Sequence, residues 1–244
     1  MNSVQELSKN QVKLIKSLGI KKYRYKHNLF VVEGKKLLAE LTKSSFTIKQ
    51  SFVTEIDTNI NLPHCSLISN HSLRSVSQLT NPHFGLALVQ IPKAQEFINE
   101  PINLVLDGIQ DPGNLGTIIR LADWYGLNQI TCTNNCVDAF SPKVVQASMG
   151  GIFRINLLET SVNKIKWLPN VYGAFMSGTD QNKVKHEFPC QIVIGNEGNG
   201  ISESIENQCT QKITIKNYGN AESLNAAMAT GIILDRFREK LNQQ

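Results

Sequence analysis

The stretch LVLDGIQDPGNLGTIIRLADWYGL, residues 104–127, decides the fold of the second half of this chain. It starts with an apolar run of the kind that forms a buried strand, and a loop rich in Asp, Pro and Gly follows. A helix is expected next, because apolar residues recur at the spacing of one helical face, at Ile118, Leu121, Ala122 and Tyr125. A buried strand that leads into an amphipathic helix is typical of α/β proteins.

Polar residues follow one another along the same helix at steps of three, at Asn114, Thr117, Arg120 and Asp123. Side chains three residues apart are neighbours on a helix surface. On these residues alone, two interpretations stay open. Either Asn114 is the helix N-cap and Arg120 is a solvated charge, or both side chains face a ligand beyond the carboxyl end of the strand.

The alternation of strands and helices continues to the end of the chain. We expect strands at 102–106, 129–133, 153–157, 171–176, 191–194 and 212–215, and helices at 115–125, 142–147, 203–208 and 223–241. This order predicts an α/β fold with a mostly parallel sheet and helices on both of its faces. Ligands of such sheets bind beyond the carboxyl ends of the strands.

The segment IVIGNEGNGIS, residues 192–202, places a second loop at that edge. Gly195, Gly198 and Gly200 would let the backbone approach a ligand closely, and Glu197 offers a carboxylate to orient a polar substrate group. The spacing matches neither the G-x-G-x-x-G dinucleotide fingerprint nor the phosphate-binding loop, which has a lysine where Ile201 stands. A sharp turn between strand and helix is the alternative interpretation.

The segment ITIKNYGNAESLNAAMATGIIL, residues 213–234, runs from a strand through a polar loop into the last helix. Ser223 or Asn220 is the expected N-cap, and Glu222 in the first turn suits the helix dipole. The small residues that follow allow close helix packing. That packing is either with the same helix of a second subunit or against the sheet of the same chain.

The basic charge of the chain is concentrated near its N-terminus. Residues 1–49 hold 11 Lys and Arg against 3 Asp and Glu, whereas residues 50–244 hold 14 against 17. The run KKYRYKHN at 21–28 mixes cations, which bind phosphates, with tyrosines, whose rings can stack on unpaired bases. We therefore expect RNA contacts from Lys9, Lys13, Lys21, Lys22, Arg24 and Lys26. A solvated basic surface, with the tyrosines facing the core, is the alternative.

A smaller α/β domain is expected before the polar, proline-bounded linker PKAQEFINEP at 92–101. Its helices are predicted at 4–18, 35–43 and 72–79, and its strands at 29–33, 46–54, 65–69 and 84–91. We place the two domains at 1–95 and 96–244.

Composition excludes several classes of protein. With 41% hydrophobic and 18% charged residues, the chain can form packed cores and is not a disordered protein. No apolar run approaches the roughly 20 residues that span a bilayer, and the opening segment lacks the apolar core of a secretory signal. The odd count of five cysteines favours free thiols and a cytoplasmic protein, with Cys132 and Cys136 expected as buried, small hydrophobic residues.

In their order and spacing, the three segments resemble the SpoU (TrmH) family of RNA 2′-O-ribose methyltransferases, within the SPOUT superfamily. The resemblance covers residues 102–238 and rests on D-x-x-x-D-P-G-N-x-G-x-x-x-R, I-G-N-E-G-x-G-I and E-S-L-N-x-A-x-A. Residues 8–34 look like the substrate-binding domain often fused to these enzymes. Lys216 stands where the family usually has a proline, so the cofactor loop is expected either to be more mobile or to gain an RNA contact.

The resemblance implies a trefoil knot in the catalytic domain, S-adenosylmethionine as the cofactor, a homodimer whose active site uses both chains, and no metal. It implies that the cofactor contacts Gly195, Ile215, Leu224 and a turn formed by Met176, Ser177 and Gly178. It implies that the reacting ribose is faced by Arg120, Asn114, Glu197, Ser223 and Asn225. Arg120 either helps to deprotonate the 2′-hydroxyl or, since a guanidinium stays protonated, binds a phosphate and stabilises charge.

The function implied is S-adenosylmethionine-dependent methylation of a ribose 2′-hydroxyl in structured RNA, with 23S ribosomal RNA favoured by the fused N-terminal domain. The alternatives are a transfer RNA 2′-O-methyltransferase and a non-catalytic RNA-binding or assembly factor on the same fold. A nucleotide-dependent oxidoreductase or kinase is disfavoured because the fingerprints of those enzymes are not matched. The sequence does not identify the nucleotide that is methylated.

Overall fold

The computed structural model describes residues 4–93 and 95–243, and their internal contacts divide them into two compact units. Unit 1 combines residues 4–93 with 138–153, and unit 2 combines residues 95–137 with 154–243. The division predicted from the sequence, at 1–95 and 96–244, did not include residues 138–153 in the first unit. Among the described residues, no helix is both long enough and apolar enough to cross a membrane.

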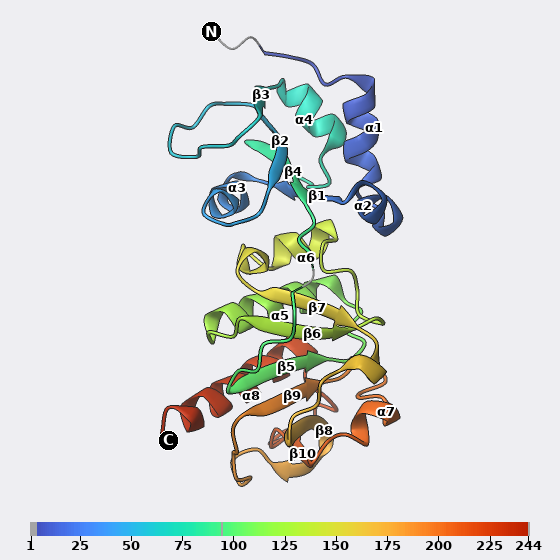
Figure 1. The fold of residues 1–244 in the computed structure, drawn as a ribbon, viewed down its shortest axis with the longest axis vertical. Coiled ribbons are helices and arrows are strands. Elements are labelled where there is room, and N and C mark those ends of the chain that lie inside the picture. The colour runs from blue at the N-terminus through green and yellow to red at the C-terminus, as the bar shows by residue number, and fades with distance from the viewer. Residues whose placement is uncertain (1–3, 94, 244) are drawn as a thin grey trace. The chain divides into compact units, whose positions relative to one another are not determined.

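Unit 2 is built on a six-stranded sheet in which every paired strand is parallel to its neighbour (Figure 1). The strand order is β10-β8-β9-β5-β6-β7. Their bounds are β5 Ile102–Leu106, β6 Gln129–Thr133, β7 Asn156–Thr160, β8 Asn170–Asp180, β9 Cys190–Ile194 and β10 Gln211–Thr214. The central strands β5, β6 and β9 are buried along their whole length, as expected for strands covered on both faces. The predicted parallel α/β sheet is confirmed.

Helices cover both faces of this sheet. Neighbouring residues on a strand point to opposite faces, so the contacts of two successive residues of β8 show which helix covers which face. Val171 of β8 belongs to an apolar cluster with Ile205 of α7 (Glu203–Glu206). The next residue, Tyr172, has its ring 4.9 Å from that of Phe237 in α8 (Ala226–Leu241). Helix α5 (Pro112–Trp124) packs beside α8, and a short 3-10 turn, η2 (Val162–Lys164), precedes β8.

Several element boundaries in unit 2 differ from the sequence prediction, and helix α5 starts at Pro112 rather than at residue 115 because Asp111 is its N-cap. The strand expected at 153–157 is β7, which starts at Asn156, because Phe153 ends a 3-10 turn and Asn156 pairs with Gln129. The last helix begins at Ala226 rather than at residue 223, since its N-cap lies just before it. Strand β8 continues to Asp180, four residues beyond the predicted end.

Unit 1 holds a four-stranded mixed sheet in the order β1-β4-β2-β3. Strands β1 (Leu29–Glu33) and β2 (Ile48–Val53) each pair antiparallel with β4 (Gly85–Gln90), and β3 (Cys65–Leu67) pairs parallel with β2. The helices are α1 Lys9–Ser17, α2 Lys21–His27, α3 Lys35–Thr42, α4 Asn70–Val76 and α6 Pro142–Ala147, with a 3-10 turn η1 at Gly151–Phe153. The predicted α/β character of the N-terminal half agrees with this arrangement.

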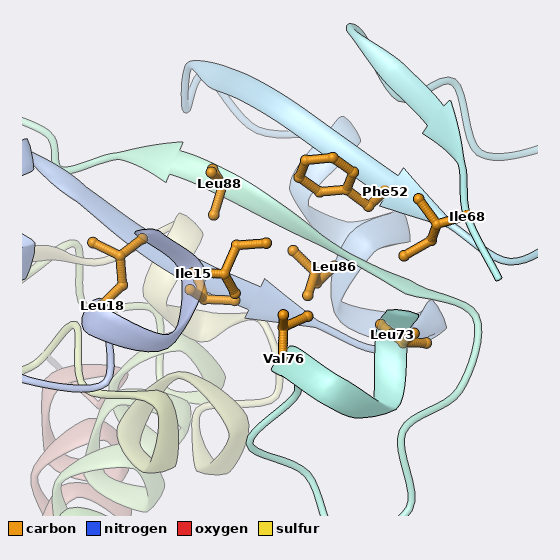
Figure 2. Packing of buried hydrophobic residues seen from close by; sticks show 9 residues of the cluster. Ile15, Leu18, Phe52, Ile68, Leu73, Val76, Leu86 and Leu88 are labelled. Atoms are coloured by element: carbon orange, nitrogen blue, oxygen red, sulfur yellow. The ribbon is translucent and has the colours of Figure 1, made fainter. Parts of the chain in front are cut away.

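The core of unit 1 lies between one face of that sheet and helices α1 and α4 (Figure 2). Its members are apolar residues at or near full burial: Ile15, Leu18, Val31, Phe52, Ile68, Leu73, Val76, Leu86 and Leu88. Burying such side chains contributes roughly 1.5–3 kcal/mol each relative to exposure. Helix α1 starts at Lys9 rather than at residue 4 because Ser8 forms a capping box with Gln11.

The run at 21–28, in which we predicted no helix, forms α2. The run lacks the apolar periodicity that would have predicted a helix. Helix α2 ends at His27, and its C-cap is Asn28, whose φ of 54° is left-handed.

Candidate active site

The first loop of the site follows β5 and begins with a buried carboxylate. Asp107 is almost fully buried, and its Oδ2 accepts a hydrogen bond from the backbone N of Ser202 at 2.7 Å. Its Oδ1 accepts a longer bond, 3.4 Å, from Thr133 Oγ1. A buried polar group is costly unless it is hydrogen-bonded, and these two bonds satisfy the carboxyl group of Asp107. They connect the segment after β5 to the end of β6 and to the loop after β9. We did not predict a role for Asp107, although an Asp directly after a buried strand is a readable signal.

Asn114 links this loop to the other two segments. The N-cap of α5 is Asp111, whose Oδ1 accepts from the backbone N of Asn114 at 2.7 Å. The side chain of Asn114 is therefore available, and its Nδ2 donates to Glu197 Oε1 at 2.7 Å. Its Oδ1 accepts from Asn225 Nδ2, also at 2.7 Å. Of the two interpretations of Asn114, helix capping is wrong.

The turn after β9 is closed by its own backbone and by Asn196. The backbone N–H groups of Asn196 and Gly200 each donate to the carbonyl of the other at 2.9 Å. Asn196 Nδ2 also donates to the carbonyl of Gly108 at 2.7 Å, which fixes the turn against the first loop. A Cβ on Gly195 would overlap the backbone of Gly200, so only glycine fits there. Asn196 is a positioning residue that we did not predict.

The third segment reaches the site through the N-cap of α8. Asn225 Oδ1 accepts from the backbone N–H groups of Ala227 at 2.9 Å and of Met228 at 3.3 Å, while its Nδ2 donates to Asn114. The prediction that Ser223 or Asn220 caps this helix is wrong. Ser223 is exposed and makes no hydrogen bond within residues 4–93 and 95–243.

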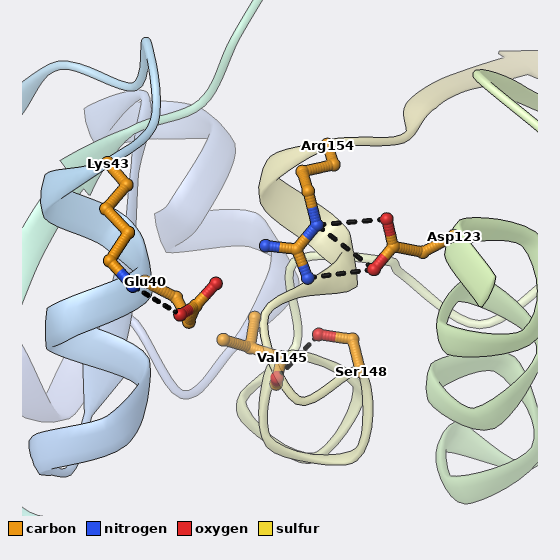
Figure 3. A network of polar contacts seen from close by, with 6 residues as sticks. All are labelled: Glu40, Lys43, Asp123, Val145, Ser148 and Arg154. Carbon is orange, nitrogen blue, oxygen red and sulfur yellow. Dashed lines mark hydrogen bonds and ion pairs between the residues drawn. The ribbon is translucent and has the colours of Figure 1, made fainter. Parts of the chain in front are cut away.

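Arg120 lies on α5 six residues after Asn114, which is about 9 Å further along the helix axis. Its guanidinium is exposed, and in the described part of the chain it forms no hydrogen bond or ion pair. The neighbouring carboxylate of Asp123 is engaged elsewhere, because it pairs with Arg154 at 2.8 Å (Figure 3). Arg120 is thus a cation that has no partner among the described residues, and it lies on the helix that carries Asn114.

Residues 176–178, which were expected to form a turn that contacts the cofactor, lie inside strand β8. Between Gly173 and Thr179 this strand leaves its register with β10, so the residues from 174 to 178 are not paired to it. Met176 is 68% exposed there, and its carbonyl accepts from Thr214 Oγ1 at 3.2 Å. A Cβ on Gly178 would lie 2.8 Å from the carbonyl oxygen of Lys212. Met176, Ser177 and Gly178 therefore form an irregular stretch of strand rather than a turn after it.

Ile215 and Leu224 flank the exposed loop between β10 and α8. Ile215 directly follows β10 and is half-buried, whereas Leu224 precedes the N-cap of α8 and is exposed. The structure thus joins Asn114, Glu197 and Asn225 by hydrogen bonds and joins Met176 to Thr214. No hydrogen bond or ion pair in the described residues joins Arg120 or Ser223 to that group.

The cysteine pair beside the first loop is buried, as expected for Cys132 and Cys136. The thiol of Cys136 donates to the carbonyl of Leu106 at 3.4 Å. A hydrogen bond from Cys132 lowers the pKa of Cys136 to about 7 against the effect of burial, while the same bond and burial raise the pKa of Cys132. All five cysteines are free. In the ranges that the structure describes, no group of three or more His, Cys, Asp or Glu side chains is placed to hold a metal ion.

The basic residues predicted to contact RNA lie on α1 and α2 of unit 1. Exposed ammonium groups are presented by Lys9, Lys13, Lys21, Lys22 and Lys26. Arg24 differs, because it is only 2% exposed. Its guanidinium pairs with Asp138, with Nε at 2.8 Å from Oδ2, and Nη1 donates to the carbonyl of Leu18 at 2.7 Å. The prediction of RNA contact by Arg24 is therefore wrong, since its charge is neutralised inside unit 1.

Comparison with known proteins finds a matching family model for each of the two parts of the chain. The model of the SpoU rRNA Methylase family matches residues 101–235, and that of the MRM3-like substrate binding domain matches residues 9–87. The 23S rRNA (guanosine(2553)-2′-O)-methyltransferase RlmP of Bacillus subtilis is 30% identical, over 98% of this chain and 100% of the relative. The mitochondrial rRNA methyltransferase 3 of Homo sapiens is 25% identical, over 90% of this chain and 69% of the relative.

Solved structures are similar over nearly the whole chain. A TrmH-family protein of Porphyromonas gingivalis is 32% identical with a TM-score of 0.84, covering 97% of this chain and 100% of its own. An AdoMet-bound rRNA methyltransferase of Sinorhizobium meliloti is 25% identical with a TM-score of 0.86, covering 98% of each chain. The family model spans more than half of the chain and includes all three linked segments. The chain belongs to the SpoU rRNA methylase family.

Proposed function

We propose that this protein transfers a methyl group from S-adenosylmethionine to a ribose 2′-hydroxyl of ribosomal RNA, with 23S ribosomal RNA as the preferred substrate. The observation that carries the proposal is the hydrogen-bonded link from Glu197 through Asn114 to Asn225, which brings three distant segments into one site. Family membership supports the reaction type. The Bacillus subtilis relative, named as a 23S rRNA 2′-O-methyltransferase and aligned over its full length, supports the substrate.

The residues fit S-adenosylmethionine through the chemistry that they present. Met176 and Leu224 are exposed apolar side chains suited to the faces of a purine, and the irregular backbone near Gly178 and Ile215 offers polar groups to its edge. Gly195 keeps the neighbouring turn free of a side chain. When bound, the cofactor supplies a methyl group attached to a sulfonium sulfur. The neutral thioether that remains after transfer is a good leaving group, so the transfer requires no metal.

The chain's own task is then to hold the ribose in line with the methyl group and to exclude water. We assign the fixed polar surface for the ribose to Asn114, Glu197 and Asn225, because their hydrogen bonds hold each other in place. Arg120, which has no hydrogen-bond or ion-pair partner among the described residues, binds a phosphate beside that ribose and stabilises the charge on the 2′-oxygen as its proton passes to the carboxylate of Glu197. Ser223 is assigned to the same site from its position two residues before Asn225.

The remaining parts of the proposal concern the whole protein. We assign RNA binding to the exposed lysines of unit 1, and cytoplasmic localisation follows from a ribosomal RNA substrate in a bacterial type of enzyme.

We infer the domain division at 1–95 and 96–244 and a trefoil knot formed by the segment after β10. We also infer a homodimer through α5 and α8, where Trp124, Met228 and Ile232 are exposed apolar side chains.

The test is a methyl-transfer assay with purified protein, labelled S-adenosylmethionine and total RNA from cells that lack the gene, with ribosomal and transfer RNA separated afterwards. The wild-type protein is expected to label the RNA, and digestion should yield a 2′-O-methylnucleoside. Arg120→Ala and Asn114→Ala are expected to lose about 100-fold or more in kcat while they retain cofactor binding by calorimetry. Cofactor and RNA binding without transfer would favour a non-catalytic RNA-binding factor and contradict the proposal. Label in transfer RNA alone would overturn the substrate assignment.

A further inference from the structure

The loop between β10 and α8, residues 215–225, carries an aromatic side chain that the proposed function does not use. Tyr218 is 86% exposed, and the Nζ of Lys216 lies 4.8 Å from the centre of its ring. A cation over the face of an aromatic ring is attracted by its π electrons. One face of the ring is thus held by the ammonium group, and the exposure leaves the other face to solvent.

This loop is ordered by its own hydrogen bonds. Asn217 Nδ2 donates to the carbonyl of Ala221 at 2.8 Å, and the backbone N of Gly219 donates to Asn217 Oδ1 at 2.8 Å. Tyr218 lies between the two bonded residues, so its backbone is fixed although its ring is exposed. An aromatic ring that remains in water gains little from the hydrophobic effect, and the fold does not explain why tyrosine stands there.

Both ends of the loop are anchored in the candidate active site. Just before the loop, Thr214 Oγ1 donates to the carbonyl of Met176 at 3.2 Å. At its far end, Asn225 Nδ2 donates to Asn114 Oδ1 at 2.7 Å. The ring of Tyr218 and the ammonium group of Lys216 therefore belong to a short segment that cannot move far from the residues assigned to the cofactor and the ribose.

We propose that Tyr218 is a stacking platform for an unpaired RNA base next to the target ribose. Lys216 holds one face of the ring and offers its charge to the adjoining phosphate. Stacking on aromatic rings together with cation–phosphate contact is how proteins hold single-stranded RNA. The inference rests on the proposed function, because it states how the same site grips its RNA substrate.

The test compares three variants on an in vitro transcript of 23S ribosomal RNA, which carries no methyl groups. Tyr218→Ala removes the ring, Tyr218→Phe keeps the stacking face, and Lys183→Gln removes an exposed charge outside the loop. For Tyr218→Ala we expect a higher KM for the transcript and a fall in kcat/KM of about 5- to 150-fold, with kcat unchanged. Tyr218→Phe and Lys183→Gln are expected to stay within about twofold of the wild type.

Two further measurements assign the cause. Cofactor affinity, measured by calorimetry without RNA, is expected to be equal in Tyr218→Ala and the wild type, whereas transcript binding in a filter assay is expected to weaken. Equal transcript affinity and kcat/KM in these two proteins would overturn the inference, and so would a loss of cofactor affinity alone. Failure of the wild type to transfer methyl groups would count against the proposed function instead. The filter assay then still decides the role of Tyr218.

Discussion

Asn114 shows how one uncharged side chain can join three parts of a chain. Its amide donates to Glu197 and accepts from Asn225, and Asn225 at the same time caps α8. Hydrogen bonds contribute only about 1–3 kcal/mol each net, with those to carboxyl groups such as that of Glu197 at the upper end, so the main effect of these bonds is to fix geometry. In the proposed reaction, fixed geometry is the larger part of what the protein has to supply.

Glu33 in unit 1 gives a prediction about pH. It is buried at the end of β1, where burial raises its pKa, and hydrogen bonds from Ser77 Oγ and from the backbone N of Gln78 oppose that rise. A carboxyl whose pKa is higher in the folded chain than its ordinary 4.5 stabilises the fold below that pH. Its contribution is lost as the pH rises through the folded-state pKa.

Glu33→Gln keeps the hydrogen-bonding shape and removes the buried charge. We expect the difference in Tm, variant minus wild type, to be more positive at about pH 7.5 than at about pH 5. Thermal unfolding followed by circular dichroism at both pH values measures it. A difference that does not change with pH would contradict the role assigned to this carboxyl.

Sequence reasoning singled out Asn114, Glu197 and Asn225 from their order along the chain, and the structure joins these three side chains by hydrogen bonds. It did not single out Asp107, although an Asp directly after a buried strand is a readable signal, and it could not find Asn196, whose partner in the first loop, the carbonyl of Gly108, lies 88 residues earlier. It misjudged Arg24 for the same reason: the carboxylate that neutralises it, Asp138, comes 114 residues later. An arginine in a basic run is indistinguishable from its neighbours until that partner is in place.

At the scale of elements, buried parallel strands were the easiest to predict. Strands β5 and β6 have the predicted bounds because their residues are mainly apolar or β-branched and turn residues follow them. The predicted bounds of strand β7 were three residues too early, because the buried residues of the preceding 3-10 turn show the same apolar pattern as the strand. The irregular stretch of β8 could not be foreseen, because the break in its pairing depends on β10.

The turn between β9 and α7 gives a prediction about two glycines. A Cβ on Gly195 would overlap the backbone of Gly200, whereas a Cβ on Gly219, in the loop before α8, would meet no atom within 4 Å. We expect Gly195→Ala to lower the free energy of unfolding by roughly 1–3 kcal/mol, and Gly219→Ala to change it by less than about 0.5 kcal/mol. Urea unfolding of the two variants tests this. Equal stabilities would show that the turn yields more easily than its contacts indicate.

At the scale of the whole molecule, the sequence predicted two α/β parts but not the grouping of residues 138–153 with the first of them. The local pattern of that segment is the same strand–helix alternation as its neighbours. Its membership depends on contacts such as that of Gln146 Nε2 with the carbonyl of Glu33, 2.9 Å apart, which no local pattern reveals.

The inferred homodimer gives a prediction at the same scale. Trp124 is 81% exposed at the end of α5, and exposed tryptophans are common anchors of protein interfaces. Trp124→Glu is expected to weaken dimerisation about 30-fold or more, measured by light scattering over a dilution series. Ile56→Glu changes an exposed apolar residue of unit 1 and is the matched control, expected to leave the dimer intact. A monomeric wild type, or a Trp124→Glu variant that dimerises normally, would contradict this interface.

The central claim is that this chain methylates one ribose of ribosomal RNA. The most direct measurement is a map of 2′-O-methyl positions in 23S ribosomal RNA from cells with and without the gene. We predict that a position loses its methyl group on deletion and regains it with the wild-type gene, but not with Arg120→Ala. Identical maps with and without the gene would contradict the account.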